Sequence, residues 1–219
     1  MIKNCEFSAN VGADGGAIST GGTLAVESSL FYNNTAHREG SANGGGGAIA
    51  ISGGVVSLTN SSFVSNYSPL EGGAIANGSE LTVTNCTFSY NTSRMGGTIH
   101  NTSNLTLRNS IIANSMESDS CLGWGTIDDG GGNLRWPSTD NTCVGDFGDP
   151  LLEPLADNGG STMTMAVTPG SAALQLADSN CPDDDQRGMP RGLLSNRCDA
   201  GAYEWQWVTT FFPAVYKNP

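Results

Sequence analysis

Charged side chains are scarce in this chain of 219 residues, since Asp, Glu, Lys and Arg together make up only 14% of it. The exposed faces of helical proteins normally carry many such side chains, so the low charge argues against a helical protein. Only nine Lys and Arg stand against 21 Asp and Glu, which gives a net charge of −12. Phosphate binding needs clustered basic side chains, and we therefore expect no nucleic-acid partner.

Long apolar runs are also missing. No run approaches the ~20 residues that a membrane-spanning helix requires, so we expect no transmembrane segment. No export signal is visible, because Met1-Ile2-Lys3 leads directly into strand-like sequence. Apolar residues nevertheless make up 37% of the chain, which also contains 30 glycines. This balance is typical of many short strands joined by Gly- and Asn-rich turns.

A repeat with a period of about 24 residues runs through the first half of the chain. In each copy a large apolar residue is followed three positions later by Asn, and Ile112–Ser115 is a degenerate last copy. A Gly-Gly-small-Ile step and an alternating strand pattern, such as Leu81-Thr82-Val83, come between the anchors. The anchors are Phe7, Phe31, Phe63, Phe88 and Ile112, and the amides are Asn10, Asn34, Asn66 and Asn91.

The repeat predicts an all-β fold, a single-stranded right-handed parallel β-helix of about five coils with a loop-rich, disulfide-stapled C-terminal cap. Each coil would hold two or three short strands that pair in parallel with their copies in the next coil. We expect the Phe anchors to form one interior column and the Asn residues an inward amide ladder. The Gly-Gly pairs should supply positive φ at the corners and allow adjacent coils to approach closely. The expected boundaries are residues 1–118 for the coils, 119–205 for a cap packed on the helix end, and 206–219 for a tail.

One interval of the repeat is longer because of an insertion from His37 to Gly44, which we expect to project as a loop from one corner. Its residues His37, Arg38 and Glu39 make it a candidate binding loop. The first coil begins in the middle of the pattern, and a bare parallel edge invites strand pairing. We therefore expect either a longer native chain or end-to-end self-association through the N-terminal coil.

The six cysteines fall into two kinds. Cys5 and Cys86 occupy the small-residue position of coils that lie three apart, roughly 14 Å, which exceeds the ~7 Å limit for a bridge. We expect both to be buried free thiols. The remaining cysteines bracket loop-rich segments, and we expect the disulfides Cys121–Cys143 and Cys181–Cys198, which fit an oxidising compartment. A metal site is the alternative, but no Cys-x-x-Cys spacing occurs.

No set of residues forms a catalytic signature. Glycoside hydrolysis needs two carboxylates ~5–9.5 Å apart on one face, and the outward positions of the coils carry few charges. His100 lies beside the fourth Gly-Gly step, where we interpret it as a solvated corner residue. The densest acidic run, Asp183-Asp184-Asp185, is a candidate calcium site because calcium prefers oxygen ligands, but it lacks the spacing of a calcium loop. We expect no cofactor, with calcium as the one candidate.

The Gly-Gly-Ala-Ile and Phe-x-x-Asn steps, with Asn85-Cys86-Thr87-Phe88, resemble the repeats of bacterial polymorphic outer-membrane proteins. The C-terminal third is similar to the choice-of-anchor Q region that often follows such repeats. Its matching segments are Asp149–Leu152, Pro154–Thr162, Pro169–Ala173, Asp185–Gly188 and Cys198–Glu204. Together the two resemblances extend from residue 1 to about residue 205. They imply an extracellular or cell-surface β-helix protein, in families mostly without an established activity. They also imply a structural role for Asp185–Gly188, in which Arg187 pairs with a buried carboxylate.

The sequence and the resemblance together predict a non-enzymatic cell-surface or secreted module with a structural or adhesive role. Its candidate partners are a carbohydrate or another surface protein. The alternative is a polysaccharide lyase or glycoside hydrolase of the pectin-lyase-like β-helix type, because right-handed β-helices host such enzymes.

Overall fold

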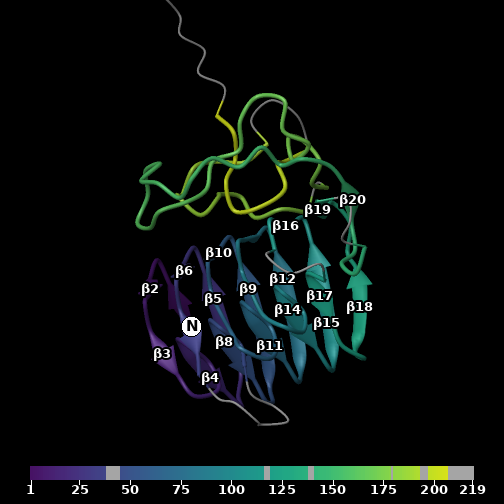
Figure 1. Cartoon of the computed structure of the whole chain (residues 1–219). Helices are drawn as coiled ribbons and strands as arrows, with labels where there is room; N and C mark the ends of the chain where they lie inside the picture. The colour runs from purple at the N-terminus through teal and green to yellow at the C-terminus, as the bar shows by residue number, and fades with distance from the viewer. Residues whose placement is uncertain (38–44, 116–118, 138–140, 179, 193–196, 207–219) are drawn as a thin grey trace, which may run out of the picture.

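The computed structural model describes residues 1–37, 45–115, 119–137, 141–178, 180–192 and 197–206. The regular elements among these residues are all β-strands, and the strands stack in parallel as a β-helix (Figure 1). Each sheet runs along the stack, with one strand from each coil. The all-β parallel β-helix that the repeat predicts is therefore confirmed.

Three long sheets form the walls of the β-helix. The first sheet contains β1 (Ile2–Lys3), β5 (Leu24–Glu27), β9 (Val55–Thr59), β12 (Glu80–Thr84), β15 (Asn104–Arg108) and β18 (Thr126–Asp129). The second contains β2 (Glu6–Ser8), β6 (Leu30–Tyr32), β10 (Ser62–Val64), β13 (Thr87–Ser89), β16 (Ile111–Ala113), β19 (Leu134–Trp136) and β20 (Asp146–Phe147). The third contains β4 (Ile18–Thr20), β8 (Ile49–Ile51), β11 (Ile75–Asn77), β14 (Ile99–Asn101) and β17 (Cys121–Leu122), and β3 (Val11–Gly12) pairs with β7 (Thr35–Ala36).

A column of phenylalanine rings fills the interior beside the second sheet. The strands of this sheet pair in register, so Phe31 lies over Phe7, Phe63 over Phe31, and Phe88 over Phe63. Successive ring centroids are 4.8, 4.7 and 4.8 Å apart and the rings are stacked. Ile112 pairs with Phe88 and continues the column. Because the strand spacing sets the ring spacing, every coil buries its aromatic side chain against the next.

An asparagine ladder runs along one corner. The Oδ1 atom of Asn34 accepts hydrogen bonds from the backbone N and Nδ2 of Asn10, at 3.0 and 2.9 Å. Asn66 and Asn91 repeat the same pair of bonds in the next two steps. In Asn91, Nδ2 donates to the carbonyl of Phe63. Burial of an amide is costly unless its polar atoms are paired, and the buried amides of Asn34, Asn66 and Asn91 are each paired both to a neighbouring Asn and to a backbone carbonyl.

The corners obtain their positive φ from a source that we did not expect. Among the Gly-Gly pairs of the four Gly-Gly-small-Ile steps, only Gly72 and Gly96 have such angles, at 57° and 62°. The expectation of positive φ was wrong for the other pairs. Glycine is required there because adjacent coils approach closely: a Cβ on Gly47 would lie 1.9 Å from the carbonyl oxygen of Gly73. The left-handed corner positions belong instead to a column of mostly asparagines with φ between 47° and 55°: Asn4, Ser28, Asn60, Asn85 and Asn109. Asn tolerates this conformation better than most residues.

The coils continue beyond residue 118. Strands β17, β18 and β19 pair with the preceding coil in all three sheets, so this boundary of the expected cap differs from the structure. Arg135 pairs with Ile112 and takes the place of the interior anchor, which is why the repeat was not visible here. The disulfide Cys121–Cys143 joins β17 of this coil to the segment between β19 and β20, and both its cysteines pack into the main core.

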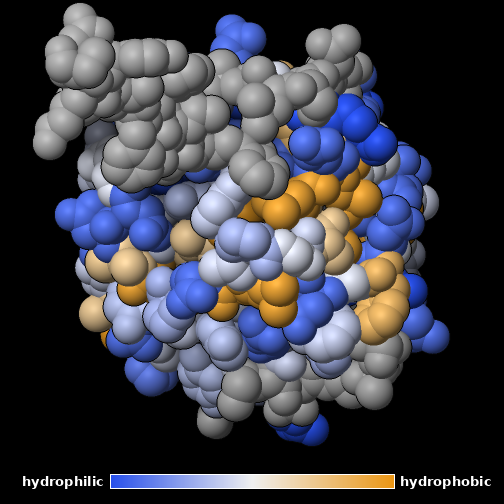
Figure 2. All heavy atoms as spheres, turned by 90° about the horizontal axis from the view of Figure 1, so that it is seen from above, coloured by the Kyte–Doolittle hydropathy of each residue, from blue (hydrophilic) through white to orange (hydrophobic). Residues whose placement is uncertain are grey.

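The described residues of the segment 149–206, which we call the strap, lie along the outer face of the second sheet and not over the end of the helix (Figure 1). Leu30 and Val64 on that face pack against Met165 of the strap, and Ile111 packs in a second cluster with Ala173 and other strap residues. Exposure of these outward apolar side chains to water would be unfavourable, and their burial is the physical reason why the strap lies along the side of the β-helix. Seen from the strap side, the surface is mainly hydrophilic and interrupted by apolar side chains (Figure 2).

The corner asparagines hold the strap. Asn60 Nδ2 donates to the carbonyl of Asp184 at 2.7 Å, and Asn109 exchanges two hydrogen bonds with Asp178. Asn85 Nδ2 lies 3.3 Å from the carbonyl of Asp199. The same left-handed residues that turn the chain therefore present their side chains to the strap.

The predicted disulfides Cys121–Cys143 and Cys181–Cys198 are both present, and they indicate an oxidising compartment. Cys5 and Cys86 are free, as expected, but only Cys86 is fully buried and Cys5 is half-buried in the first coil. No helix capable of crossing a bilayer occurs in the part of the chain that the structure describes.

Candidate functional site

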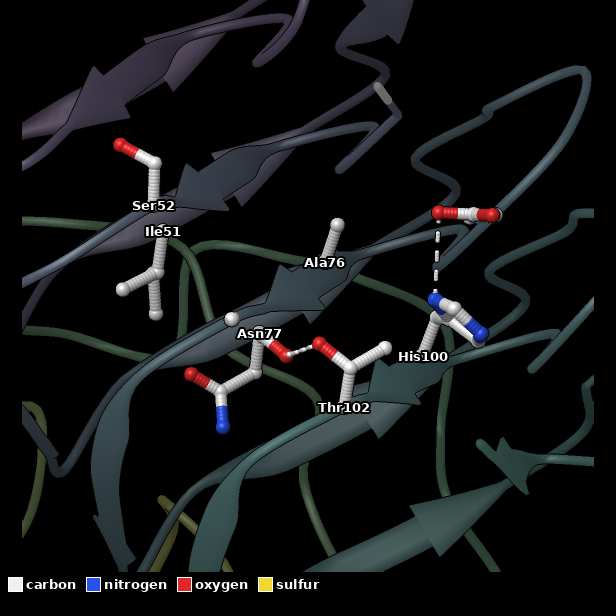
Figure 3. A pocket seen from close by; sticks show the side chains of 8 residues that line it. Ile51, Ser52, Ala76, Asn77, His100 and Thr102 are labelled. Carbon is white, nitrogen blue, oxygen red and sulfur yellow. Dashed lines mark hydrogen bonds and ion pairs between the residues drawn. The ribbon is translucent and has the colours of Figure 1, made fainter. Parts of the chain in front are cut away.

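The outer face of the third sheet carries the candidate site. Strand pairing places Ala50, Ala76 and His100 in one outward row across β8, β11 and β14. The small side chain of Ala76 leaves a hollow beside the larger histidine. The result is a pocket with a volume of about 130 Å³. Figure 3 shows Ala76 between Ser52 and His100, with Thr102 beside Asn77.

His100 is buried and not solvated, so our interpretation of it as a solvated corner residue was wrong. Only 2% of its side chain is exposed, and its Nδ1 atom lies 3.2 Å from Oε2 of Glu71 (Figure 3). Glu71 belongs to the corner before the third Gly-Gly step, from which its side chain reaches the histidine of the next coil. The geometry is that of an imidazole whose Nδ1–H donates to a carboxylate. The buried Nε2 atom has no hydrogen-bond partner among the described residues.

Trp124 lies beside His100 in the last coil. Its ring meets the imidazole edge to face, with centroids 5.7 Å apart and an interplanar angle of 87°. The tryptophan is nevertheless 77% exposed. Large aromatic side chains are seldom left in water without a partner, because their burial is strongly favourable. An exposed indole beside a polar pocket is therefore a candidate platform for a ligand.

The pocket rim presents hydroxyl groups. Thr102 Oγ1 donates to the carbonyl of Asn77 at 3.1 Å, which Figure 3 marks, and Ser52 Oγ donates to the carbonyl of Thr20 at 3.2 Å. Both hydroxyls are thus fixed by the backbone of the preceding coil. Glu71 is the one carboxylate among the described residues that line this pocket.

The thiol of Cys86 is buried inside the β-helix. Burial raises the pKa of this thiol to about 12 and makes it inert.

The structure separates the residues that the sequence offered as site candidates. His37 is exposed at the end of β7, and Arg38 and Glu39 lie outside the described residues. Asp183 and Asp184 line a second hollow, of about 330 Å³, between the first coils and the strap. No group of three or more His, Cys, Asp or Glu side chains that could hold a metal occurs among the residues described.

Asp185 does not fit a calcium ligand, because its carboxylate is already engaged. Oδ2 accepts from Nε and Nη2 of Arg187, at 2.9 and 2.7 Å, and from the backbone N of Glu204. Oδ1 accepts from the backbone N of Arg187 and Met189. Arg187 also lies 3.6 Å above the ring of Tyr203. The pairing of Arg187 with a buried carboxylate, which the family resemblance implied, is thus what the structure contains.

The site of His100, Glu71 and Trp124 was missed from the sequence. Strand alternation around Ile99 does place His100 outward, in line with Ala50 and Ala76, and that signal was available. The contact with Glu71 was not visible, because it joins a corner of one coil to a strand of the next.

Comparison with known proteins gives a family and no close relative. Residues 1–126 match the family model described as a right-handed β-helix region. No curated protein and no solved structure matches the chain significantly. The match ends within the last coil and does not reach the strap.

Proposed function

The chain belongs to the right-handed β-helix family, and from that premise we propose that it is a non-enzymatic, secreted or cell-surface module that binds carbohydrate. Two disulfides support an oxidising location outside the cytoplasm. The resemblance of its repeats to those of polymorphic outer-membrane proteins, and of its strap to the choice-of-anchor Q region, supports attachment to a surface. A rigid stack of sheets with a structural or adhesive role fits this location.

The observation that carries the proposal is the exposed ring of Trp124 next to a pocket of hydrogen-bonding groups. Sugars present apolar C–H faces together with many hydroxyl groups. An aromatic platform with a few fixed polar groups is complementary to such a ligand. The pocket lies on paired strands, so its side chains are held in place before the ligand arrives, which reduces the entropic cost of binding.

The test is a binding panel of immobilised neutral, amino and acidic polysaccharides. We expect the protein to be retained on at least one of them. Trp124→Ala should weaken that binding at least tenfold, because truncation of an interface tryptophan commonly costs about 2 kcal/mol, and ~1.4 kcal/mol is a factor of ten. Tyr90→Ala, which removes another half-exposed aromatic ring, is the control and should leave binding unchanged. Failure to bind any polysaccharide, or equal binding by the Trp124 variant, would contradict the proposal.

A polysaccharide lyase or glycoside hydrolase remains the second candidate, and one observation favours it. The carboxylate of Glu71 contacts the imidazole of His100 in the same pocket, an arrangement that can orient a general base. A hydrolase with two carboxylates would need a second one ~5–9.5 Å away, and the described lining offers only Glu71. Incubation with the same polysaccharides, followed by assays for reducing ends and unsaturated products, decides between the two. We expect no product.

A further inference from the structure

The hydroxyl groups of the pocket rim act as hydrogen-bond acceptors toward a ligand. A hydroxyl has one proton, and those of Ser52 and Thr102 are donated to backbone carbonyls of the preceding coil. The lone pairs of both oxygens are what remains for a molecule in the pocket. A ligand group that itself only accepts would find no donor in these two hydroxyls.

Glu71 adds a negative charge to these acceptors. One of its oxygens faces Nδ1 of His100, and no Lys or Arg pairs with it among the residues that the structure describes. The described lining of the pocket contains no Lys or Arg either. An ionised carboxylate accepts hydrogen bonds and donates none. Within the part of the chain that the structure describes, the pocket therefore combines acceptors with a carboxylate that no Lys or Arg pairs with.

The size of the pocket limits what can enter. About 130 Å³ corresponds to roughly four water molecules at ~30 Å³ each. This space suits a substituent of a sugar and not a chain of sugar rings. The ring that carries the substituent would have to rest outside the pocket, where the exposed face of Trp124 lies in the next coil.

We propose that this pocket selects a free amino group, so that the ligand of the carbohydrate-binding face is an oligosaccharide of amino sugars. An ammonium group has three donors, no acceptor and a positive charge, which complements the rim and Glu71. An acetamido group brings a carbonyl oxygen that would meet acceptors, a hydroxyl brings one donor and no charge, and a uronate would be repelled. His100 is a positioning residue in this scheme, because its Nδ1–H holds the carboxylate of Glu71. The inference rests on the proposed function.

The test compares three β-1,4-linked tetrasaccharides by isothermal titration calorimetry: glucosamine, N-acetylglucosamine and glucose. We expect the glucosamine tetramer to bind at least tenfold more tightly than the other two, with an advantage that falls as salt is raised. If the acetylated or the glucose tetramer binds as tightly, the amino-group inference is overturned while the proposed carbohydrate binding stands. If no saccharide binds, here or on the polysaccharide panel, the proposed function itself fails and the inference with it.

Two pairs of variants separate the pocket from general attraction to an acidic protein. Glu71→Gln should remove most of the preference for glucosamine, whereas Glu6→Gln, which removes an exposed carboxylate from the second sheet, should keep it. Equal losses in both variants would overturn the inference. His100→Asn keeps an N–H donor toward Glu71 and should retain the preference, and His100→Leu should lose it. Retention in both His100 variants would refute the positioning role and leave Glu71 to be judged by the first pair.

Discussion

Replacement of Arg191 by Met should loosen the attachment of the strap to the β-helix. The guanidinium is buried, with 1% of the side chain exposed, and its Nη1 atom lies 3.1 Å from Oε2 of Glu204. Its Nη2 atom donates to Oδ1 of Asn60 at 3.0 Å and to the carbonyl of Gly201 at 2.8 Å. One side chain thus joins two parts of the strap to a corner of the β-helix.

The magnitude follows from the burial of this ion pair. Removing one partner of a buried pair costs about 3–5 kcal/mol, because the remaining charge stays buried without its counter-charge. For a chain of this size each kcal/mol lowers the melting temperature by about 2–4 °C, so Arg191→Met should lower it by roughly 6–20 °C. Lys3→Met is the matched control, since the Lys3–Glu27 pair is 47% and 37% exposed and an exposed pair contributes about 1 kcal/mol or less.

The loss of stability in Arg191→Met should depend on pH in a defined direction. Burial raises the pKa of Glu204 and of Asp199 above the usual range of carboxyl groups, and Arg191 opposes this shift. A carboxyl group whose pKa is higher in the folded than in the unfolded state stabilises the folded state when it is protonated. This contribution is complete at pH values below the pKa of the unfolded state, and it is lost as the pH rises through the pKa of the folded state. Without Arg191 the carboxyl of Glu204 should be protonated more readily. The deficit of Arg191→Met is therefore expected to shrink between about pH 7.5 and about pH 5.

Thermal unfolding followed by circular dichroism at both pH values, together with limited proteolysis, measures these effects. We expect the first cleavages of the Arg191 variant to fall within the strap while the coils remain protected, because the coils are held by their own registered core. A melting temperature within about 2 °C of the Lys3→Met control at neutral pH would refute the argument. So would a deficit that grows on acidification.

Two further predictions concern the core, and one concerns its thiols. Phe63→Ala removes a ring from the middle of the column and should lower the free energy of unfolding in urea by about 3–5 kcal/mol. Phe7→Ala, at the half-buried end of the column, should lower it clearly less. Equal costs would mean that the column is not a continuous core. Asn66→Ala leaves the backbone N of Asn34 without its acceptor and the carbonyl of Phe31 without its donor, and should cost at least about 1–3 kcal/mol by the same measurement. A thiol reagent at about pH 8 should label Cys5 and not Cys86 in the native protein, because burial raises the pKa of the Cys86 thiol to about 12; labelling of both by mass spectrometry would contradict this burial.

The carbohydrate proposals depend on the same rigidity. Glu71, His100 and Trp124 come from three successive coils, and the registered pairing of the third sheet brings them together. Any change that shifts this register would disrupt the site without touching its residues. The variants of the site should therefore be compared only after their thermal unfolding has been shown to match that of the unmodified protein.

The sequence by itself determined the coils, because the contacts that build them join residues one repeat apart. Phe31 and Phe63, or Asn34 and Asn66, are equivalent positions of successive copies, so the period places them against each other without further information. The two disulfides could be predicted for a similar reason, since each closes a short local segment. Where an anchor was replaced, as at Arg135, the repeat faded from the sequence although the coil continued.

Only the tertiary structure decided where the strap lies and where a ligand could bind. Asn60 and Arg191 are 131 residues apart, and no periodicity relates them. The pocket depends on the difference between the small Ala76 and the large His100 in one outward row, and on a corner carboxylate that reaches into the next coil. Such contacts depend on the shapes of side chains in adjacent coils, which a repeat of residue types does not specify.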